Sequence, residues 1–554
     1  MIQVVVQVLF LPFSVLYYLI RQLVLPINFM LGTLSSNNFH RDHNLSPIQD
    51  EISDNLLEHD PSTSPLPHDF PQGMFIRIGP NQQFRPRGRH HWFDGDGMMH
   101  AVKIGCQSVR YTNKYVRTEK YNVEHQFGRS IVHGMLDCVN PIRYIDLLFM
   151  RIVYGVPFKN YEPNTANTSL THHAGKCFAS VENCLPYEIE LPTLKTVGLK
   201  DLGPKYVESS FTAHPKLDAE TGELIGFNYN AVRPYVSYHI FDKHGQLTHT
   251  TPISEAPRAT MMHDFAITKN YTVFIFGSVV LDVYKAIAGI PFLDFKKGLP
   301  TQIAVVPRYY KDGVDKIHWF TCKPGHVFHI ANAFEREDEI VMHCFRMEQF
   351  TVSLLPKENV AFDVVELGAV FYEYKMNLAT GLVQENTMYF SNVDCPDSPP
   401  ESMLGEFPVI NSSYVGKPYQ YCWVGRSPRT GQVSDAVVKL DVENLTYKEY
   451  YFGCENKRAC EWTFVPSRDL DAKEDDGYVV NFLYNEKLNA STFEILNSST
   501  LCKKSIVRFN CPRRVPYGFH GLFVRREEYE PISPLVISAG SPISPYEAGS
   551  LSPS

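Results

Sequence analysis

Histidine is the residue type of this chain with the widest chemical possibilities, and four of its 21 histidines lie in unusual surroundings. Apolar, glycine or proline residues flank them, and a neutral imidazole buried in such a context needs a reason. These four are His214 in SFTAHPKLD, His263 in MMHDFAI, His329 in HVFHIANAFE and His520 in VPYGFHGLFV. A zinc-finger site is excluded, because its ligands come in close pairs. The four could meet at one metal only in a closed architecture whose distant strands point at a common axis.

Short β-strands are the elements that the sequence predicts around these histidines. Runs of β-branched and aromatic residues recur between Gly, Pro, Asn and Asp turns, as in VSYHIF, YTVFIF, EIVMHCF and GYVVNFLY. This pattern predicts many antiparallel strands of ordinary length. About 450 residues of such strands are too many for a simple sandwich, whereas four-stranded blades around an axis would use them naturally. No sequence repeat is visible, so the pattern alone does not set the number of blades.

Composition indicates a large globular protein. The 554 residues are 44% hydrophobic and 20% charged, which provides ample material for a core and excludes disorder for most of the chain. The net charge of -8 gives no general footprint for nucleic acid. The 12 cysteines contain no CxxC pair, so we expect mostly buried thiols in a reducing compartment. Sequons such as Asn444-Leu-Thr leave a lumenal location open.

The N-terminus is unusually apolar. Residues 4–20 carry no formal charge, and a second apolar stretch covers 23–31. The first run is at the lower limit for a spanning helix, and Pro12 and Pro26 would kink the segment. No basic region precedes the run, which disfavours a secretory signal. We expect an anchor embedded in or lying on a membrane; the alternative is a buried helix packed on the domain.

Two further segments are interrupted apolar inserts, at 136–158 and 284–300. Each could be a helix that covers a sheet or a propeller face, or a surface that dips into lipid beside the entrance of a site. Polar clusters at 32–71 indicate a linker or an extended arm, and the Ser/Pro-rich end at 529–554 indicates a disordered tail.

Six segments, in order, resemble those of the carotenoid cleavage oxygenases. They are FIRIGPNQQFRPRGRHHWFDGDGMMH, NTANTSLTHHAGK, FTAHPKLDAETGEL, MMHDFAIT, FHIANAFE and RVPYGFHGLF, and together they extend over about 69–524. HPK-D--TGE, MMHDFA and VPYGFH are especially similar to the plant-type enzymes that cleave carotenoids and apocarotenoids at internal double bonds. The resemblance implies an all-β fold, a seven-bladed β-propeller with a helical and loop cap over an axial iron.

The resemblance also implies a set of site residues. The four iron ligands of the family fall on His214, His263, His329 and His520, and the cofactor is Fe(II) without an organic group. Three carboxylates that orient imidazoles correspond to Glu182, Glu406 and Glu461, where Phe407 and Trp462 indicate burial.

Other histidines of the conspicuous motifs are not expected to be ligands. Asp94-Gly95-Asp96-Gly97 has the chemistry of a tight turn, so we interpret HWFDGDGMMH and its His100 as structural. The histidine pairs that begin at His90 and His172 are also left out of the site.

The function implied is that of a non-haem Fe(II) dioxygenase that cleaves an internal C=C bond of a carotenoid or apocarotenoid with O₂. Two alternatives remain: a stilbene-cleaving oxygenase of the same fold, and a non-catalytic carotenoid-binding propeller. Stilbene-cleaving relatives carry a lysine directly before the first of the three glutamates, whereas this chain has Val181. The substrate expected is therefore an apolar polyene.

The expected organisation has four parts. They are a membrane-associated segment at 1–31, a polar arm at 32–68, the oxygenase domain at 69–524 and a disordered tail at 525–554. The partners would be the polyene, O₂ and membrane lipid, which the N-terminal segment and the apolar inserts would contact. We expect a membrane-associated protein that faces the cytosol, and the organelle, the scissile bond and the oligomeric state stay open.

Overall fold

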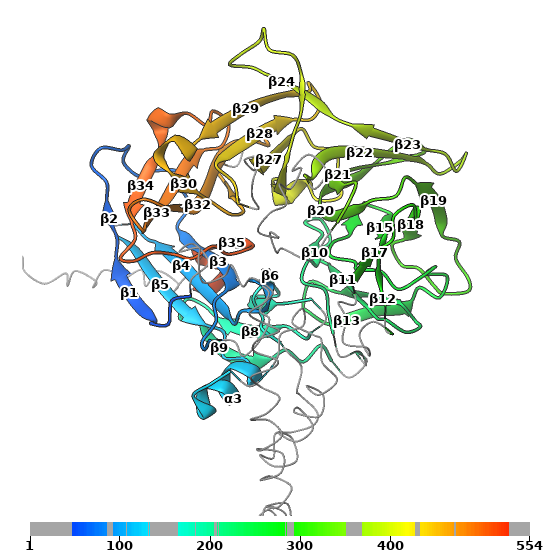
Figure 1. Cartoon of the computed structure of the whole chain (residues 1–554), viewed down its shortest axis with the longest axis horizontal. Helices are drawn as coiled ribbons and strands as arrows, with labels where there is room; N and C mark the ends of the chain where they lie inside the picture. The colour runs from blue at the N-terminus through cyan, green and yellow to red at the C-terminus, as the bar shows by residue number, and fades with distance from the viewer. Residues whose placement is uncertain are drawn as a thin grey trace, which may run out of the picture.

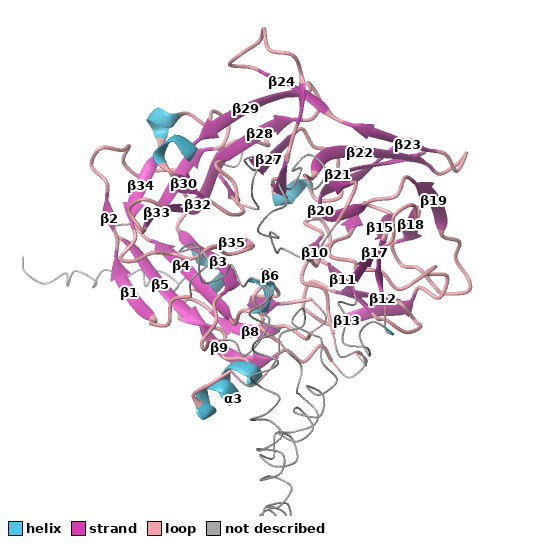
Figure 2. Ribbon diagram, in the orientation of Figure 1, coloured by secondary structure: helices cyan, strands magenta, loops and turns pink. Residues whose placement is uncertain are grey.

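The computed structural model describes ten stretches and four single residues between 47 and 530. They are 47–85, 92–106, 108–130, 132, 164–182, 184–203, 206, 208, 210–282, 284, 293–350, 368–426, 433–469 and 472–530. Antiparallel sheets arranged around one axis make up most of this part of the chain (Figures 1 and 2). Seven sheets of four to six strands are the blades of a β-propeller, as predicted, and β16 and β17 form a small extra ribbon.

The first three blades and the ribbon have the following strands. Blade 1 has the order β1-β5-β4-β3-β35, with bounds β1 Ile52–Leu56, β3 Gly73–Pro80, β4 Gly97–Ile104, β5 Val109–Tyr115 and β35 Gly521–Arg525. Blade 2 comprises β6 Ser169–His173, β7 Lys176–Ser180, β8 Tyr187–Glu190 and β9 Lys195–Leu199. Blade 3 comprises β10 Lys216–Leu217, β11 Leu224–Tyr229, β12 Val236–Phe241 and β13 Leu247–Pro252. The ribbon pairs β16 Val279–Leu281 with β17 Leu293–Phe295.

The remaining four blades follow in chain order. Blade 4 comprises β14 Ala266–Ile267, β15 Tyr271–Phe276, β18 Thr301–Pro307 and β19 His318–Cys322. Blade 5 comprises β20 His326–Arg336, β21 Glu339–Met347, β22 Val370–Asn377 and β23 Val383–Thr387. Blade 6 comprises β24 Tyr389–Asn392, β25 Glu401–Ser402, β26 Gly405–Val409, β27 Tyr421–Arg426, β28 Ala436–Asp441 and β29 Thr446–Tyr451. Blade 7 comprises β2 Glu58–His59, β30 Lys457–Arg458, β31 Thr463–Pro466, β32 Gly477–Asn485, β33 Ala490–Asn497 and β34 Val507–Asn510.

The hydrophobic core lies between neighbouring blades. Strands in the middle of a blade are buried along their whole length, as β11 (LIGFNY) and β12 (VSYHIF) are. Their large side chains pack against the next blade: Phe227 of β11 shares one apolar cluster with Phe274 of β15. Complete burial of such a side chain stabilises the fold by about 1.5–3 kcal/mol. Each blade is therefore held by both neighbours, which fixes the inner strands around the axis.

The two ends of the described chain close the ring. The C-terminal strand β35 pairs with the N-terminal strand β3 in blade 1, and Figure 1 shows the red and the blue strand side by side. Likewise β2 pairs with β34 in blade 7. The polar stretch predicted as an arm thus contains two edge strands, β1 and β2, which extend blades 1 and 7 by one strand each.

Helices are scarce in the described residues. One is α3 (Glu119–Phe127), which begins after its N-cap Thr118 and ends at Gly128 in the left-handed conformation. The other is the single turn α7 (Arg526–Tyr529), which continues the chain directly after β35. Within this part of the chain no helix has the length and apolarity needed to cross a membrane.

Several predictions fall on residues outside the described ranges. These are the anchor at 1–31, the helix at 136–158, residues 285–292 of the insert at 284–300, and the tail beyond residue 530. Those predictions stay predictions. The cysteines that the structure describes are free, and the majority of them are buried.

Candidate metal centre

The site is built by the strand of each blade that lies nearest the axis. These inner strands are β35, β6, β10, β14, β20, β26 and β31, and Figure 1 shows several of them around the centre. His214, His263 and His520 stand just before β10, β14 and β35, and His329 lies near the start of β20. Inner strands of a propeller begin at the same end of the axis, so residues at these equivalent places come together although they are far apart in sequence.

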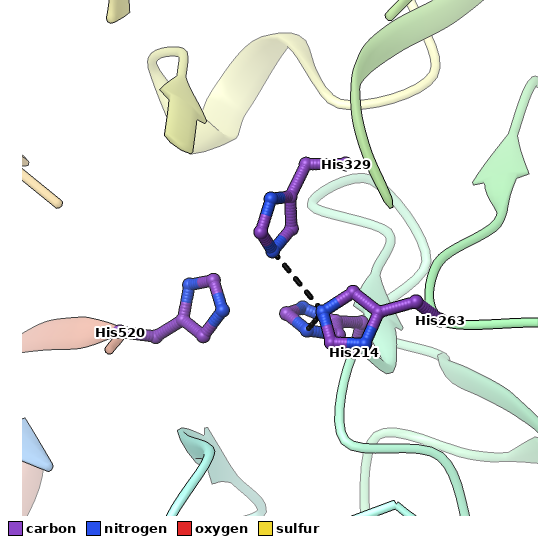
Figure 3. Close-up of side chains that lie close together, drawn as sticks. All are labelled: His214, His263, His329 and His520. Atoms are coloured by element: carbon purple, nitrogen blue, oxygen red, sulfur yellow. Dashed lines mark hydrogen bonds between the residues drawn. The ribbon is translucent and has the colours of Figure 1, made fainter. Parts of the chain in front are cut away.

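The four histidines converge as one group. Their ligand atoms all lie within 4.8 Å of one another, and Figure 3 shows the imidazoles turned inward, with His520 reaching in from the side opposite His263. The Nε2 atom of His263 is 2.9 Å from Nε2 of His214 and 3.1 Å from Nε2 of His329. Two nitrogens about 2.1 Å from one metal at a right angle would be about 3.0 Å apart. The observed spacings fit two neighbouring pairs of metal ligands.

Three of the four imidazoles are held from behind by a carboxylate. Nδ1 of His329 lies 2.7 Å from Oε2 of Glu406, and Nδ1 of His520 lies 2.8 Å from Oε1 of Glu461. Nδ1 of His263 bonds Oε1 of Glu182 in the same way. A protonated Nδ1 that donates to a carboxylate leaves the lone pair on Nε2, the atom that faces the centre. The structure thus brings the three glutamates of the sequence prediction to the imidazoles.

The carboxylates are oriented in turn. The hydroxyl of Tyr229 donates to Oε2 of Glu182 at 2.8 Å. The backbone N–H of Phe407 donates to Oε2 of Glu406 at 3.1 Å, and the N–H of Gly521 donates to Oε2 of Glu461 at 2.7 Å. Glu182 and Glu461 thus use one oxygen for the imidazole and the other for a second donor, whereas both contacts of Glu406 go to Oε2, and its buried Oε1 has no hydrogen-bond partner among the described residues. Such outer contacts limit how far the rings can turn.

His214 differs from the other three. Its imidazole has no carboxylate partner among the residues that the structure describes. Its backbone N–H donates to Oγ1 of Thr212 at 3.0 Å, and its ring packs against His263 and His520 at centroid distances of 4.4 and 4.5 Å. Its position follows from the backbone and the neighbouring rings.

Burial favours the neutral form of three of the four imidazoles. Desolvation, reinforced by the neighbouring imidazoles, lowers the pKa of His214 and of His263 well below the usual value and that of His329 to about 3. Desolvation also raises the pKa of the Glu406 carboxyl to about 8, against the lowering effect of the Phe407 N–H. Neutral imidazoles are the form that binds a metal, and a cation at the centre would favour ionised carboxylates behind them.

Two phenylalanines that the sequence prediction did not assign to the site form part of its wall. The ring of Phe328 stacks on His263 at a centroid distance of 3.9 Å, and Phe407 lies 5.1 Å from His329. Phe407 has a φ of 57°, a conformation that is costly for a bulky residue and that recurs at functional sites. The signals in the sequence are position next to a candidate ligand (Phe328-His329) and next to a candidate carboxylate (Glu406-Phe407).

The histidines left out of the prediction lie elsewhere. His100 is buried in β4, where its Nδ1 is 2.8 Å from the hydroxyl of Tyr111. His172 lies in β6, 3.7 Å from Glu528. His90 lies outside the described residues. Neither described histidine belongs to the group of four.

The ligand set is suited to a divalent transition metal. Four neutral nitrogens bring no negative charge of their own, whereas the three carboxylates behind the imidazoles supply negative charge when they are ionised. Ferrous iron fits this donor set, and four protein ligands leave positions for small molecules in an octahedral field. Fold and site together define a β-propeller with an all-imidazole centre that is suited to a metal ion.

Comparisons with known proteins agree with this description. The family described as RPE65, retinal pigment epithelial membrane protein, matches residues 45–525. Carotenoid 9,10(9',10')-cleavage dioxygenase 1 of Phaseolus vulgaris is 32% identical over 499 residues, which are 85% of this chain and 88% of the relative. The enzyme of the same name from Arabidopsis thaliana is 32% identical over 517 residues, 88% of this chain and 90% of the relative. The chain belongs to this family of carotenoid cleavage oxygenases and is accordingly an enzyme, a dioxygenase.

Solved structures show the same fold. The lignostilbene dioxygenase of Pseudomonas brassicacearum is similar with a TM-score of 0.74 and 26% identity, over 87% of this chain and 98% of that one. A variant of the Synechocystis apocarotenoid oxygenase is similar with a TM-score of 0.73 and 25% identity, over the same shares of the two chains. A cobalt-substituted form of the Synechocystis enzyme is also similar, with a TM-score of 0.71.

Proposed function

We propose that this chain is a non-haem Fe(II) dioxygenase that cleaves an internal C=C bond of a carotenoid or apocarotenoid. The observation that carries the proposal is the convergence of four imidazoles, three with Nδ1 bonded to a carboxylate. The reaction takes one C=C bond and one O₂ to two C=O bonds, so electrons and atoms balance without an added reductant. No organic cofactor is required.

His214, His263, His329 and His520 would hold the iron, which when bound supplies a centre for the activation of O₂. Glu182, Glu406 and Glu461 would keep the imidazoles in the ligating tautomer. Phe328 and Phe407, packed on the site rings, would place one apolar double bond at the centre and exclude water from it. The contribution of the protein is thus orientation and a dry, apolar wall.

Apolar polyenes are the substrate class that the residue before Glu182 favours. Val181 is buried there and offers no hydrogen bond to a phenol. The plant relatives are named for cleavage at the 9,10 and 9',10' positions, which supports the same internal bond here. Stilbene cleavage is the second candidate, because a lignostilbene dioxygenase is among the similar structures.

The remaining proposals concern location and organisation. The segment at 1–31 would bind the membrane in which polyenes dissolve, the catalytic propeller at 69–524 would face the cytosol, and 525–554 would include a disordered tail. A carotenoid-binding propeller without activity would not need four converging histidines, so the complete set favours an enzyme.

The test is to purify the full chain, measure its iron content, and incubate it in air with β-carotene, an apocarotenal and a hydroxystilbene. We expect about one iron per chain and aldehyde or ketone fragments of the polyenes by chromatography. Iron with no carbonyl product from any of the three would reject the enzymatic proposal. Preferred cleavage of the stilbene would reject the substrate class and leave the iron site standing.

A further inference from the structure

One buried carboxylate near the site does not contact an imidazole. Asp264 directly follows His263, and its side chain is 3% exposed. Its Oδ1 lies 2.6 Å from Nζ of Lys216, and its Oδ2 accepts the backbone N–H of Ile330 at 2.9 Å. These two contacts reach two other blades, because Lys216 begins β10 of blade 3 and Ile330 lies in β20 of blade 5.

Each end of this link is next to a site histidine. Lys216 is two residues after His214, and Ile330 is the residue after His329. Asp264 therefore joins the segments that carry His214, His263 and His329. These are the same three rings whose Nε2 atoms lie 2.9 and 3.1 Å apart.

The contacts of Asp264 are well suited to fix the distances between blades 3, 4 and 5. A carboxylate buried to this degree is stable only when paired. Besides Lys216 and the N–H of Ile330, Asp264 accepts the N–H of Phe265 on Oδ1 at 2.8 Å, so its side chain is held in place by three donors. The ammonium of Lys216 also lies over the ring of Phe265, 5.9 Å from its centroid. Since His214 has no described carboxylate behind its ring, Lys216 provides a side-chain connection between its strand and the rest of the site.

We infer that Asp264 and Lys216 are positioning residues that set the spacing of three metal-binding imidazoles across blades 3, 4 and 5. The inference rests on the proposed function in one respect: it takes the four histidines to bind a metal. Asp264 acts on the metal through the backbone, not through a ring nitrogen, and so differs from Glu182, Glu406 and Glu461.

The experiment compares metal affinity in matched variants of the full chain. Co(II) is titrated into the metal-free proteins and followed by visible absorption, and the iron retained after dialysis is measured separately. The variants are Asp264→Asn, which keeps an acceptor for the Ile330 N–H but removes the charge, and Lys216→Met and Lys216→Arg. The control is Asp475→Asn, because Asp475 pairs with Lys439 and both side chains are comparably buried, at 13% and 8% exposed.

We expect Asp264→Asn and Lys216→Met to weaken Co(II) binding by about 10–100-fold, the usual effect of losing an outer contact of a metal site. Lys216→Arg should recover most of the affinity, since it keeps the charge and the donors. Asp475→Asn should lower the melting temperature without weakening Co(II) binding. Should Asp264→Asn fail to fold, the two variants of the more exposed Lys216 decide the question.

Wild-type Co(II) affinity in Lys216→Met and in any folded Asp264→Asn would overturn the inference. So would an equal loss in Asp475→Asn, because the effect would then be general destabilisation. Failure of the proposed function is a separate result: the wild-type protein itself would bind no metal, or would bind it and cleave nothing.

Discussion

Glu461 holds His520 and the residue after it at once: its Oε1 lies 2.8 Å from Nδ1 of His520, and its Oε2 accepts the N–H of Gly521. Glu461 precedes β31 of blade 7, whereas His520 precedes β35 of blade 1. The pair therefore connects blades 7 and 1, the two blades in which N-terminal and C-terminal strands pair. A single carboxylate thus links these two blades and orients one imidazole.

Replacement of Glu461, Glu406 or Glu182 by Gln should lower metal affinity and turnover by about 10–100-fold each. The imidazole would be less firmly oriented, although its ligand nitrogen would be retained. Glutamine can still accept one hydrogen bond, so folding should be retained. Iron content and initial rates of carbonyl formation measure the effect. Unchanged rates in all three variants would show that these carboxylates do not orient the imidazoles.

Single replacement of His214, His263, His329 or His520 by Ala should have a larger effect, because each would remove one of only four protein ligands. We expect loss of bound iron and of detectable turnover in every case. His244→Ala is the matched control, since His244 is exposed and outside the group of four. Full activity of any one of the four variants would remove that histidine from the site.

The close contact between Gly79 and Gly518 should also be essential, both for stability and for iron binding. A Cβ added to Gly79 would lie 2.4 Å from Cα of Gly518, two residues before His520, so the two backbones would have to separate. We expect Gly79→Ala to destabilise the protein by about 1–3 kcal/mol or more and to reduce iron content as well. In Gly105→Ala the new methyl would meet only Ser108 at an ordinary 3.5 Å, so its melting temperature and iron content should match the wild type. Equal behaviour of the two variants would contradict this account.

The strands of the blades could be predicted from local sequence, whereas the convergence of the ligands could not. Runs such as VSYHIF are strands because β-branched and aromatic residues fill both faces of a buried blade, and this much is local information. The convergence of His214 and His520 is not local: it depends on ring closure by β3 and β35, and it was the motif resemblance that placed both at one centre.

Contacts through the backbone could not be predicted at all. Asp264 in MMHDFAI carries no sign that its second oxygen binds the N–H of Ile330, since that contact exists only when blades 4 and 5 are side by side. The stacking of Phe328 on His263 likewise depends on the register of β20, which is shifted by a bulge between Val327 and Ile330. The spacing of residues in the sequence does not reveal such a bulge.

Deletion of residues 1–31 should release the protein from membrane to soluble fractions and leave the iron content unchanged. The apolar run lies well before β1, and it precedes every residue of the four-histidine group. Fractionation of cells that express the full and the truncated chain, with iron analysis of both, measures this. Aggregation of the truncated chain with loss of iron would show instead that the run packs on the propeller.

The source of the product oxygens distinguishes dioxygenase chemistry from its main alternative. A dioxygenase transfers both atoms of one O₂, one to each new carbonyl. A monooxygenase would form an epoxide with two electrons from a reductant, water would open the epoxide to a diol, and cleavage of the diol to two carbonyls would then need a two-electron oxidant. The dioxygenase route needs no added reductant, because the polyene itself supplies the electrons that reduce O₂. Under ¹⁸O₂ in ordinary water, with short reaction times to limit exchange, we therefore expect label in both fragments of a carotenoid cleaved at the 9,10 bond. Mass spectrometry of the two fragments, with a parallel incubation in H₂¹⁸O to correct for exchange, gives the answer. Label in one fragment only would reject the dioxygenase mechanism, whatever the substrate.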